Sequence, residues 1–340
     1  MGCCGGLLKS LCCIAILGVA AAITYRFGPW YKTSEPDNST TFTARNACDG
    51  CCNGLKSNCA KPVNQVTFPM VHNAHSSKAD YFLAYNNNKN LEEALVAGYR
   101  GLMLDSCICD GSIGEYVQEI FNGEDNGETY LGFCHKSCDA GVRNPEKLLS
   151  NINTFLEVNK NEVLILEFEI NDYSLADLFL AIKASGLGRY AHVPSIYTSD
   201  NYQWPTMQTL IDADDRLLLL AHGDGIQSCR TEDCPDILYT YDYIQQTNWN
   251  DDTCDIMGNS REDRGFFLMN HWMNNDASDL PSPTNAAEFN TYESLRKRYE
   301  RCKDDGADGD GKRVPNIIAV DFWDVGDVLD FVRDVNEGNV

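Results

Sequence analysis

Seven short apolar runs recur along the chain, and each of them ends in a polar or titratable side chain. Runs of this length, bounded by loops, are typical of buried strands. In a parallel barrel the carboxyl ends of the strands share one face, so polar groups placed there indicate chemistry. The runs cover residues 66–73, 100–105, 131–135, 163–169, 216–222, 265–271 and 316–321. Because every run has its polar residue at the carboxyl end, the seven runs together predict one functional face.

Segments with helical periodicity separate these runs, as expected of an α/β protein. The clearest is residues 145–158, which begins with a proline suited to a first helical turn and keeps its apolar residues on one face. Other helices are expected over residues 91–96, 174–184, 205–211, 288–302 and 326–335. For the fifth strand the only candidate is residues 193–197. We expect residues 64–340 to form a TIM-type (β/α) barrel, which can be irregular or incomplete.

The first 63 residues differ in composition from the barrel segment. Residues 11–23 form an uninterrupted apolar run that fits a signal peptide and is shorter than the roughly 20 residues of a membrane-spanning helix. We expect residues 1–31 to be a signal peptide or signal anchor, and residues 32–63 to be a linker with a cysteine-rich lead-in. A glycosylation sequon at Asn38 lies in this linker. The protein is thus predicted to enter the secretory pathway and to be extracellular or anchored to a membrane.

The cysteines agree with this prediction. Of the 16 cysteines, four lie in the leader and the other 12 form an even set, which in a secreted chain is typical of disulfides. The spacing of Cys48, Cys51 and Cys59 leaves zinc binding as an alternative for the lead-in. Further along, Cys134 and Cys138 flank His135, and we expect them to form a local disulfide; two longer crosslinks are the alternative.

The net charge of −23 excludes some partners. Nucleic acid is not expected, because its phosphate backbone requires a basic protein surface. Broad electrostatic docking on anionic lipid is disfavoured for the same reason.

Four blocks, at residues 64–77, 100–105, 134–135 and 315–322, carry a family resemblance. In this order they resemble the phosphatidylinositol-specific phospholipase C X-domain type of phosphodiesterase, and most closely its secreted, cysteine-containing members. The resemblance implies a phosphoric diester hydrolase that cleaves a phosphoinositide or a related phosphodiester by internal attack of a neighbouring hydroxyl on phosphorus. The expected partners are a phospholipid or small phosphodiester substrate and a membrane surface, and the expected state is a monomer.

This reaction needs a base for the attacking hydroxyl and an acid for the leaving alcohol, and histidine titrates in the range that suits both. By resemblance, His72 is the base and His135 is the acid. Asp321 matches a carboxylate that pairs with the base, and Asp105 matches one that lies close to the phosphate. We expect these four side chains to be catalytic, and to converge with Asn73 and Glu169 at one end of the barrel.

Two departures from the family concern the charge on the phosphate. Metal-independent bacterial members have arginine at the position of Cys107, and calcium-dependent eukaryotic members have glutamate at the position of Met103. Asn73, Asp105 and Glu169 nevertheless match three of four calcium-ligand positions, and all three offer the oxygen atoms that a hard cation prefers. Calcium is therefore a candidate cofactor. The alternative is a metal-free site in which a basic residue screens the phosphate, from among Arg143, Lys136 and Lys78.

Other functions stay open on the same residues. Glycerophosphodiesterase or sphingomyelinase-D-like chemistry could use the same barrel, although Met103 counts against it. A catalytically idle barrel could serve as a binding module, although both histidines and Asp105 are retained. For substrate binding, we expect Asn73, Glu169 and His271 to take part.

Overall fold

The computed structural model describes most of the barrel segment and the lead-in. The described residues are 42–110, 129–135, 137–194, 203–226, 236–257, 265–304 and 314–340, and they belong to one compact unit, Phe42–Val340. The predicted leader and Asn38 lie outside them and remain predictions. Among the described helices, none has both the length and the apolar character needed to cross a bilayer.

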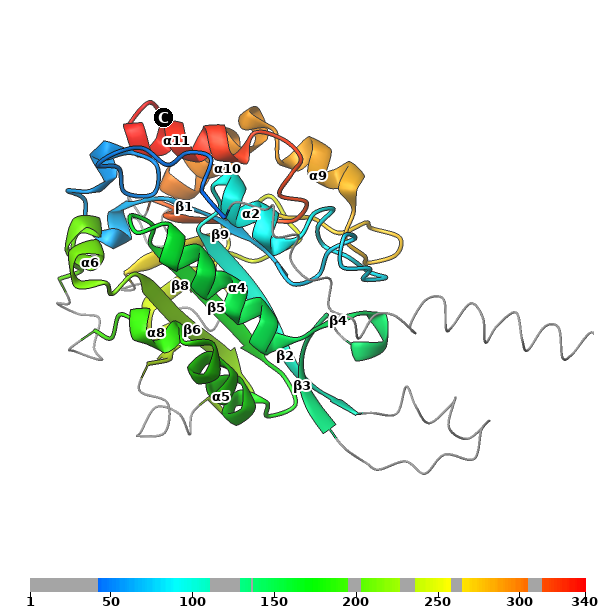
Figure 1. Ribbon diagram of the computed structural model, residues 1–340. Coiled ribbons are helices and arrows are strands. Elements are labelled where there is room, and N and C mark those ends of the chain that lie inside the picture. Colours follow the sequence, from blue (N-terminus) through cyan, green and yellow to red (C-terminus); the bar gives the residue numbers. More distant parts are fainter. Residues whose placement is uncertain are drawn as a thin grey trace, which may run out of the picture. The chain divides into compact units, whose positions relative to one another are not determined.

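A curled, mainly parallel sheet forms the centre of the fold, with helices on its outer face (Figure 1). Eight strands follow one another in parallel, in the order β7-β6-β5-β2-β1-β10-β9-β8. Their bounds are β1 (Phe68–Val71), β2 (Gly101–Asp110), β5 (Leu164–Ile170), β6 (Leu217–Gly223), β7 (Leu238–Tyr239), β8 (Ile244–Gln246), β9 (Phe266–Asn270) and β10 (Ile317–Val320). The short helix α8 (Thr240–Tyr243) joins β7 to β8, but no ladder pairs these two strands within the described residues. The predicted TIM-type fold is thus confirmed in its incomplete form.

Two strand predictions need correction. Residues 131–135 do not form a third barrel strand, because β3 (Thr129–Cys134) pairs antiparallel with the outer half of β2 and with β4 (Val142–Arg143). The sequence run misleads here because β2 continues past Asp105 to Asp110 and offers its outer half to an antiparallel neighbour. For the fifth strand, Val193 is not in a strand and residues 195–197 lie outside the described part. The sheet is instead extended by β7 and β8, which are too short to be recognised as apolar runs.

The helices follow the predicted periodicity, with one division. They are α2 (Leu91–Ala97), α4 (Pro145–Val158), α5 (Leu175–Ser185), α6 (Met207–Ala213), α9 (Pro283–Phe289), α10 (Tyr292–Asp304) and α11 (Val328–Glu337), with 3-10 turns η1 (Lys56–Asn58), η2 (Val63–Gln65), η3 (Cys138–Ala140) and η4 (Leu187–Tyr190). At the start of α4, the Asn144 side chain accepts a hydrogen bond from the Lys147 amide at 2.9 Å and so caps the first turn. The predicted helix 288–302 is two helices, because α9 ends at Phe289 and α10 begins at Tyr292.

Alternation along the strands separates an outer apolar layer from the barrel interior. On β5, Leu164 and Leu166 pack outward with the helices, whereas Ile165 packs among interior side chains. Burial of each such side chain stabilises the fold by roughly 1.5–3 kcal/mol. Glu167 and Glu169 continue the Ile165 series, so the same alternation turns both carboxylates toward the interior, near the carboxyl end of the strand.

A buried ion pair lies at the other end of the sheet, next to the amino ends of β2 and β5. Arg100, which precedes β2, is 1% exposed, and its Nε donates to Glu162 Oε2 at 2.6 Å. Its Nη1 donates to the carbonyls of Leu95 and Tyr99 at 2.7 Å each. The guanidinium therefore links the end of α2 to the turns that lead into β2 and β5.

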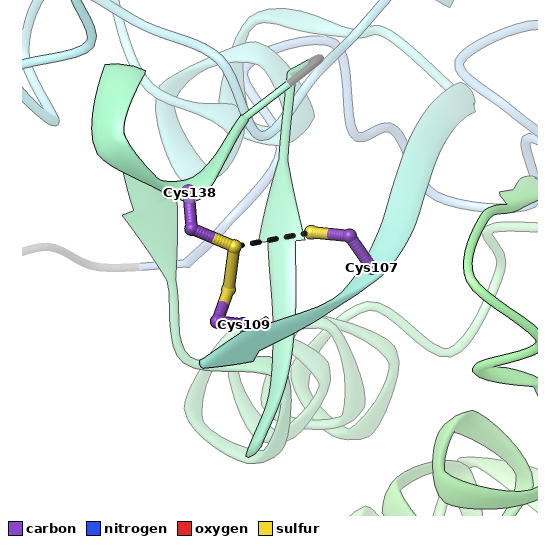
Figure 2. Close-up of side chains that lie close together, drawn as sticks. All are labelled: Cys107, Cys109 and Cys138. Carbon is purple, nitrogen blue, oxygen red and sulfur yellow. Dashed lines mark hydrogen bonds between the residues drawn. A yellow bond between two sulfur atoms is a disulfide. The ribbon is translucent and has the colours of Figure 1, made fainter. Parts of the chain in front are cut away.

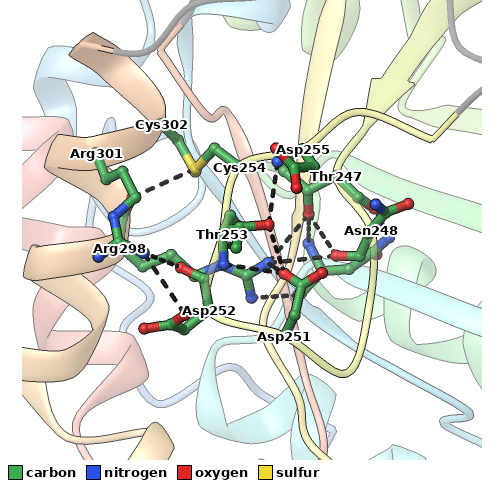
Figure 3. The surroundings of a disulfide bond; sticks show 11 residues. Thr247, Asn248, Asp251, Asp252, Thr253, Cys254, Asp255, Arg298, Arg301 and Cys302 are labelled. Atoms are coloured by element: carbon green, nitrogen blue, oxygen red, sulfur yellow. Dashed lines mark hydrogen bonds and ion pairs between the residues drawn. A yellow bond between two sulfur atoms is a disulfide. The ribbon is translucent and has the colours of Figure 1, made fainter.

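A disulfide and an arginine hold the segment between β8 and β9 against α10 (Figure 3). Cys254 is bonded to Cys302, and Arg298 donates to the carbonyls of Thr253 at 3.0 Å and Asn248 at 3.3 Å. In the lead-in, Cys48 is bonded to Cys51 and Cys52 to Cys59, so the structure has disulfides where zinc was the alternative. Cys229 and Cys234 lie outside the described residues.

Candidate active site

A cavity of about 770 Å³ opens at the carboxyl ends of the parallel strands. Its lining includes polar side chains from the interior series of five strands or from the residue that follows a strand: His72, Asp105, Glu167, Glu169, His222 and Asn270. Asn73 and His135 line it as well. The structure thus brings together five of the predicted site residues, with Asp321 directly behind them.

His72 follows β1 and is held on two sides. Its Nδ1 lies 2.8 Å from Asp321 Oδ1, and because an ionised carboxylate can only accept, the Nδ1–H donates. Its ring stacks on Trp272, with centroids 3.9 Å apart and planes inclined by 10°. With Nδ1 engaged in this way, Nε2 is the nitrogen that can exchange a proton in the cavity.

The sheet register explains why Asp321 meets His72. Val71 of β1 pairs with Val320 of β10, so the next residue on each strand lies beside the other. Asn86 donates to the same Asp321 oxygen at 3.1 Å, and Asp321 is 4% exposed. The carboxylate is therefore fixed in the orientation that selects the Nδ1–H tautomer of His72.

His135 comes from the antiparallel hairpin. Its Nδ1 lies 3.1 Å from the Ala84 carbonyl oxygen, which accepts from the Nδ1–H. Both histidines are thus oriented through Nδ1 by groups at the edge of the cavity that they line.

Two disulfides hold the hairpin that carries His135. Cys107 is bonded to Cys134 and Cys109 to Cys138, so the prediction of a local Cys134–Cys138 bond is wrong and the longer crosslinks are present. The reason is the antiparallel pairing, which brings the β2 cysteines to Cα–Cα distances of 6.3 and 5.8 Å from their partners. Figure 2 shows the Cys109–Cys138 bond with the Cys107 side chain beside it. Cys107 Sγ lies 3.8 Å from Cys138 Sγ, so the two bonds are neighbours.

Carboxylates dominate the side of the cavity formed by β2 and β5. Asp105 pairs in register with Glu169, and burial together with the charges of Glu169 and Glu167 raises the pKa of Asp105 well above its ordinary value. The Asn73 amide lies 3.0 and 3.1 Å from the two Asp105 oxygens, to which its nitrogen can donate. The orientation of the Asn73 amide depends on its surroundings. In the opposite orientation its oxygen and those of Asp105 could both face a cation.

The calcium prediction fits these residues by donor type. Asn73, Asp105 and Glu169 supply only oxygens, as a hard cation prefers. Among the His, Cys, Asp and Glu side chains of the described residues, the one group of three with ligand atoms within 4.8 Å of one another is Cys107, Cys109 and Cys138. Those sulfurs are disulfide-bonded and provide no thiolate for a metal.

His222 lies next to the carboxylates. Its Nδ1 is 3.4 Å from Glu167 Oε1 and its Nε2 is 4.0 Å from Glu169 Oε2. Although burial opposes the charged form, these two carboxylates raise the pKa of His222. The imidazole is thus the group through which the structure offsets part of the negative charge on β5.

The structure does not bring His271 to the cavity. It is fully buried, and its Nε2–H donates to the Phe289 carbonyl at 2.8 Å. Burial, followed by the charge of Arg298, lowers the pKa of His271 to about 3. Strand alternation explains the placement, because Leu268 and Asn270 face the interior and the next side chain therefore faces outward.

Two of the basic residues proposed to screen a phosphate, Arg143 and Lys78, do not line the cavity. Arg143 is bound to Glu92 at 2.7 Å and to Asp80 at 3.4 Å. Lys78 lies over the Tyr85 ring, 6.0 Å from its centroid. Lys136 lies outside the described residues, and no described residue of the lining is lysine or arginine.

Four side chains of the site were missed by reasoning from the sequence: Glu167, Trp272, Asn86 and Asn270. For Glu167 and Asn270 the alternation within each strand was a usable signal, since both share a face with interior apolar residues. Trp272 and Asn86 lie in loops, and their contacts with His72 and Asp321 depend on tertiary structure.

An incomplete α/β barrel with acid–base side chains at its carboxyl mouth has the architecture of a TIM-barrel enzyme. The family model described as PI-PLC X matches residues 116–336. The chain therefore belongs to the PI-PLC X family. The matched segment includes His135, Glu169 and Asp321 and begins after His72.

Curated relatives and solved structures are similar at low identity. A PI-PLC X domain-containing protein of Arthroderma benhamiae is 24% identical over 85% of this chain and 90% of its own length. One of Arabidopsis thaliana is 22% identical over 81% of this chain, which spans 62% of that relative. The phosphatidylinositol-specific phospholipase C of Listeria monocytogenes is 15% identical with a TM-score of 0.48, over 83% of this chain and 96% of its own. A calcium-dependent phosphoinositol-specific phospholipase C of Pseudomonas is 11% identical with a TM-score of 0.41, over 82% and 95%.

Proposed function

We propose that the protein is a phosphodiester hydrolase of the phospholipase C type, with His72 as general base and His135 as general acid. The observation that carries the proposal is the 2.8 Å contact of His72 Nδ1 with buried Asp321, made by a histidine that shares its cavity with His135. A base whose tautomer is fixed by a carboxylate, in the same cavity as a second oriented imidazole, suits a reaction that needs both a proton acceptor and a proton donor.

The proposed reaction has two proton transfers. His72 Nε2 takes the proton of a substrate hydroxyl as its oxygen bonds to phosphorus, and the bond from phosphorus to the leaving oxygen breaks. His135, protonated at the start, gives its proton to that leaving oxygen, which departs as an alcohol. Asp321 stabilises the imidazolium that forms at His72. The products are a cyclic phosphate and an alcohol, and the two histidines exchange protonation states.

The charge of the phosphate is the second requirement. Asn73, Asp105 and Glu169 would hold a calcium ion, and the bound ion would supply charge neutralisation at the phosphate oxygens. In that case a chelator abolishes turnover and added calcium restores it. A reaction that proceeds unchanged in chelator assigns the charge compensation to histidine instead.

A phosphoinositide or a related phosphodiester is the proposed substrate class, with a phospholipid at a membrane surface as its source. The support is the PI-PLC X family, to which the chain belongs. Five described disulfides support the further proposal of a secreted or membrane-anchored protein, because such bonds persist in oxidising compartments.

The test is incubation of the purified protein with a panel of phosphodiesters, with and without calcium, while products are followed by phosphorus NMR. We expect a cyclic phosphate, and we expect His72→Ala and His135→Ala each to slow its formation on the order of 10²–10⁴-fold. His192→Ala is the matched control, since His192 lies outside the cavity beside Asp215. Wild-type turnover in both single variants would refute the assignment, and no product from any diester would favour a binding module.

A further inference from the structure

One short stretch of the loop between β1 and α2 contacts the groups that orient both histidines. In residues 83–86, which we call the bridging segment, the Ala84 carbonyl accepts a hydrogen bond from His135 Nδ1 at 3.1 Å. Two residues later, Asn86 Nδ2 donates to Asp321 Oδ1 at 3.1 Å, the oxygen that also accepts from the proposed base. Two residues of chain extend over at most about 7 Å. The bridging segment therefore limits how far apart the supports of the base and of the acid can lie.

Both ends of the bridging segment are attached to the neighbouring elements. At one end, the Leu83 amide donates to the carbonyl of Ala140, the last residue of η3, at 2.7 Å. At the other end, the Asn86 carbonyl accepts from the Phe322 amide at 2.8 Å. Between them, the Tyr85 ring meets the Phe322 ring edge-on, with centroids 6.1 Å apart. The segment thus joins the hairpin that carries the acid to the end of β10.

The residue that the segment holds at β10 has a strained backbone. Phe322 is fully buried and has a φ of +47°, in the left-handed region that bulky residues adopt only when their surroundings enforce it. The contacts with Tyr85 and with the carbonyl of Asn86 are part of those surroundings. Because Phe322 directly follows Asp321, a segment that holds Phe322 also influences the direction of the Asp321 carboxylate.

We propose that Asn86 is a positioning residue that acts through Asp321, and that the bridging segment fixes the proposed base and acid relative to each other. This rests on the proposed function, because the two histidines have these roles only in that reaction. Within the described residues, the hydrogen bonds of the Asp321 carboxylate all go to Oδ1, from His72 and Asn86. Loss of the Asn86 donor frees the carboxylate to rotate, and a shifted segment also moves the carbonyl that orients His135.

The kinetic test compares two asparagines of the same loop. Asn86→Ala should lower kcat on the order of 10-fold with little change in KM, because a misoriented catalytic group slows the chemical step rather than binding. Asn88→Ala is the matched control, since Asn88 donates to Asp324 Oδ1, also at 3.1 Å, and lies outside the cavity lining. In an Asp321→Ala background, Asn86→Ala should change kcat by less than about 2-fold, because the group through which it acts is gone. A loss of kcat that persists there would show a purely structural effect.

A spectroscopic test separates this inference from the proposed function. Long-range ¹H–¹⁵N NMR spectra of neutral imidazoles report which ring nitrogen carries the proton, and they apply here to His72 and His135. We expect the Nδ1–H tautomer in both rings of the wild type and a mixture of tautomers in both rings of Asn86→Ala. Asn88→Ala should leave both rings unchanged. This result supports the inference even if the protein hydrolyses nothing.

A second variant is available if Asn86→Ala does not fold. Tyr85 is half-buried, and Tyr85→Ala removes its ring from Phe322 while it leaves the hydrogen bonds of the bridging segment in place. It should shift the tautomers of both histidines, and Tyr85→Phe, which keeps the ring, should restore them. A shift confined to His72 would overturn the bridging role. Unchanged imidazoles in every folded variant would overturn the inference as a whole, as would an equal shift in Asn88→Ala.

Discussion

Removal of the Cys107–Cys134 bond tests whether the hairpin needs both of its disulfides. Taken alone, a bridge that spans 27 residues stabilises a protein by about 3.6 kcal/mol in the chain-entropy relation. The Cys109–Cys138 bond already connects the two strands, however. With that bond in place, the loop that Cys107–Cys134 closes contains only about six residues, from Cys107 to Cys109 and from Cys134 to Cys138. The same relation then gives about 2 kcal/mol for the second closure. We therefore expect Cys107→Ala/Cys134→Ala to lose about 2 kcal/mol and to remain folded.

Loss of both bridges should be far more severe. The two contributions together approach 6 kcal/mol, which is comparable to the whole stability of many domains. The informative variant is therefore the single-bridge one, in which the folded state survives and its activity can be measured. Because His135 directly follows Cys134, we expect phosphodiesterase activity to fall through kcat.

The assay is urea unfolding of the purified variant and wild type, together with turnover of the best diester substrate. Cys48→Ala/Cys51→Ala serves as the control, since it removes a bridge from the lead-in, outside the cavity lining, and should leave kcat intact. A Cys107→Ala/Cys134→Ala variant with unchanged stability and turnover would refute the reasoning. So would a peptide map of the native protein that shows Cys134 bonded to Cys138.

Three further predictions follow from buried groups. Because folding raises the pKa of Asp105 above 3.8, the folded protein loses stability as the pH rises from about 4 through that raised pKa. Asp105→Asn should therefore raise Tm by a few degrees at pH 7 and hardly at pH 3. An equal effect at both pH values would contradict the raised pKa. Arg100→Met leaves buried Glu162 without its partner and should lower the free energy of unfolding in urea by about 3–5 kcal/mol. The double variant Arg100→Met/Glu162→Gln should recover most of this loss. A wild-type unfolding curve for the single variant would count against the prediction. Trp272→Leu should lower kcat on the order of 10-fold with little change in KM, because the ring that stacks on His72 is lost. Trp272→Phe keeps an aromatic ring against His72 and should keep most of the activity. Equal activities in the two variants would exclude the stacking role.

Residues with strong local patterns were predictable. Helix α4 begins at Pro145 and ends at Val158 as expected, because its cap, its first-turn proline and its apolar face agree. His72 and Asp321 were predictable as partners through the family resemblance, and each follows directly on a buried strand. At these positions the structure suggested by the local sequence is also the one that the tertiary fold requires.

Other features depend on information that a run of apolar residues does not carry. Nothing in residues 131–135 distinguishes an antiparallel hairpin strand from a parallel barrel strand, so the partners of Cys134 and Cys138 could not be assigned. Glu169 was chosen through the family resemblance, as a match to a calcium-ligand position, although Glu167 is the carboxylate buried in the cavity. His271 was chosen because it ends the apolar run 265–271, and the alternation that turns it away from the cavity was not applied.

The pairing of β1 with β10 has a consequence for the order of folding. Phe68 is aligned with Ile317, and the His72–Asp321 contact joins residues 249 positions apart. Contacts this distant in sequence are slow to form, because the loop entropy must be overcome before the contact contributes. During synthesis, β1 emerges early and keeps an unpaired edge until the last barrel strand is available. The His72–Asp321 pair should therefore be among the last parts of the barrel to be assembled, so that the proposed activity would report on completed folding.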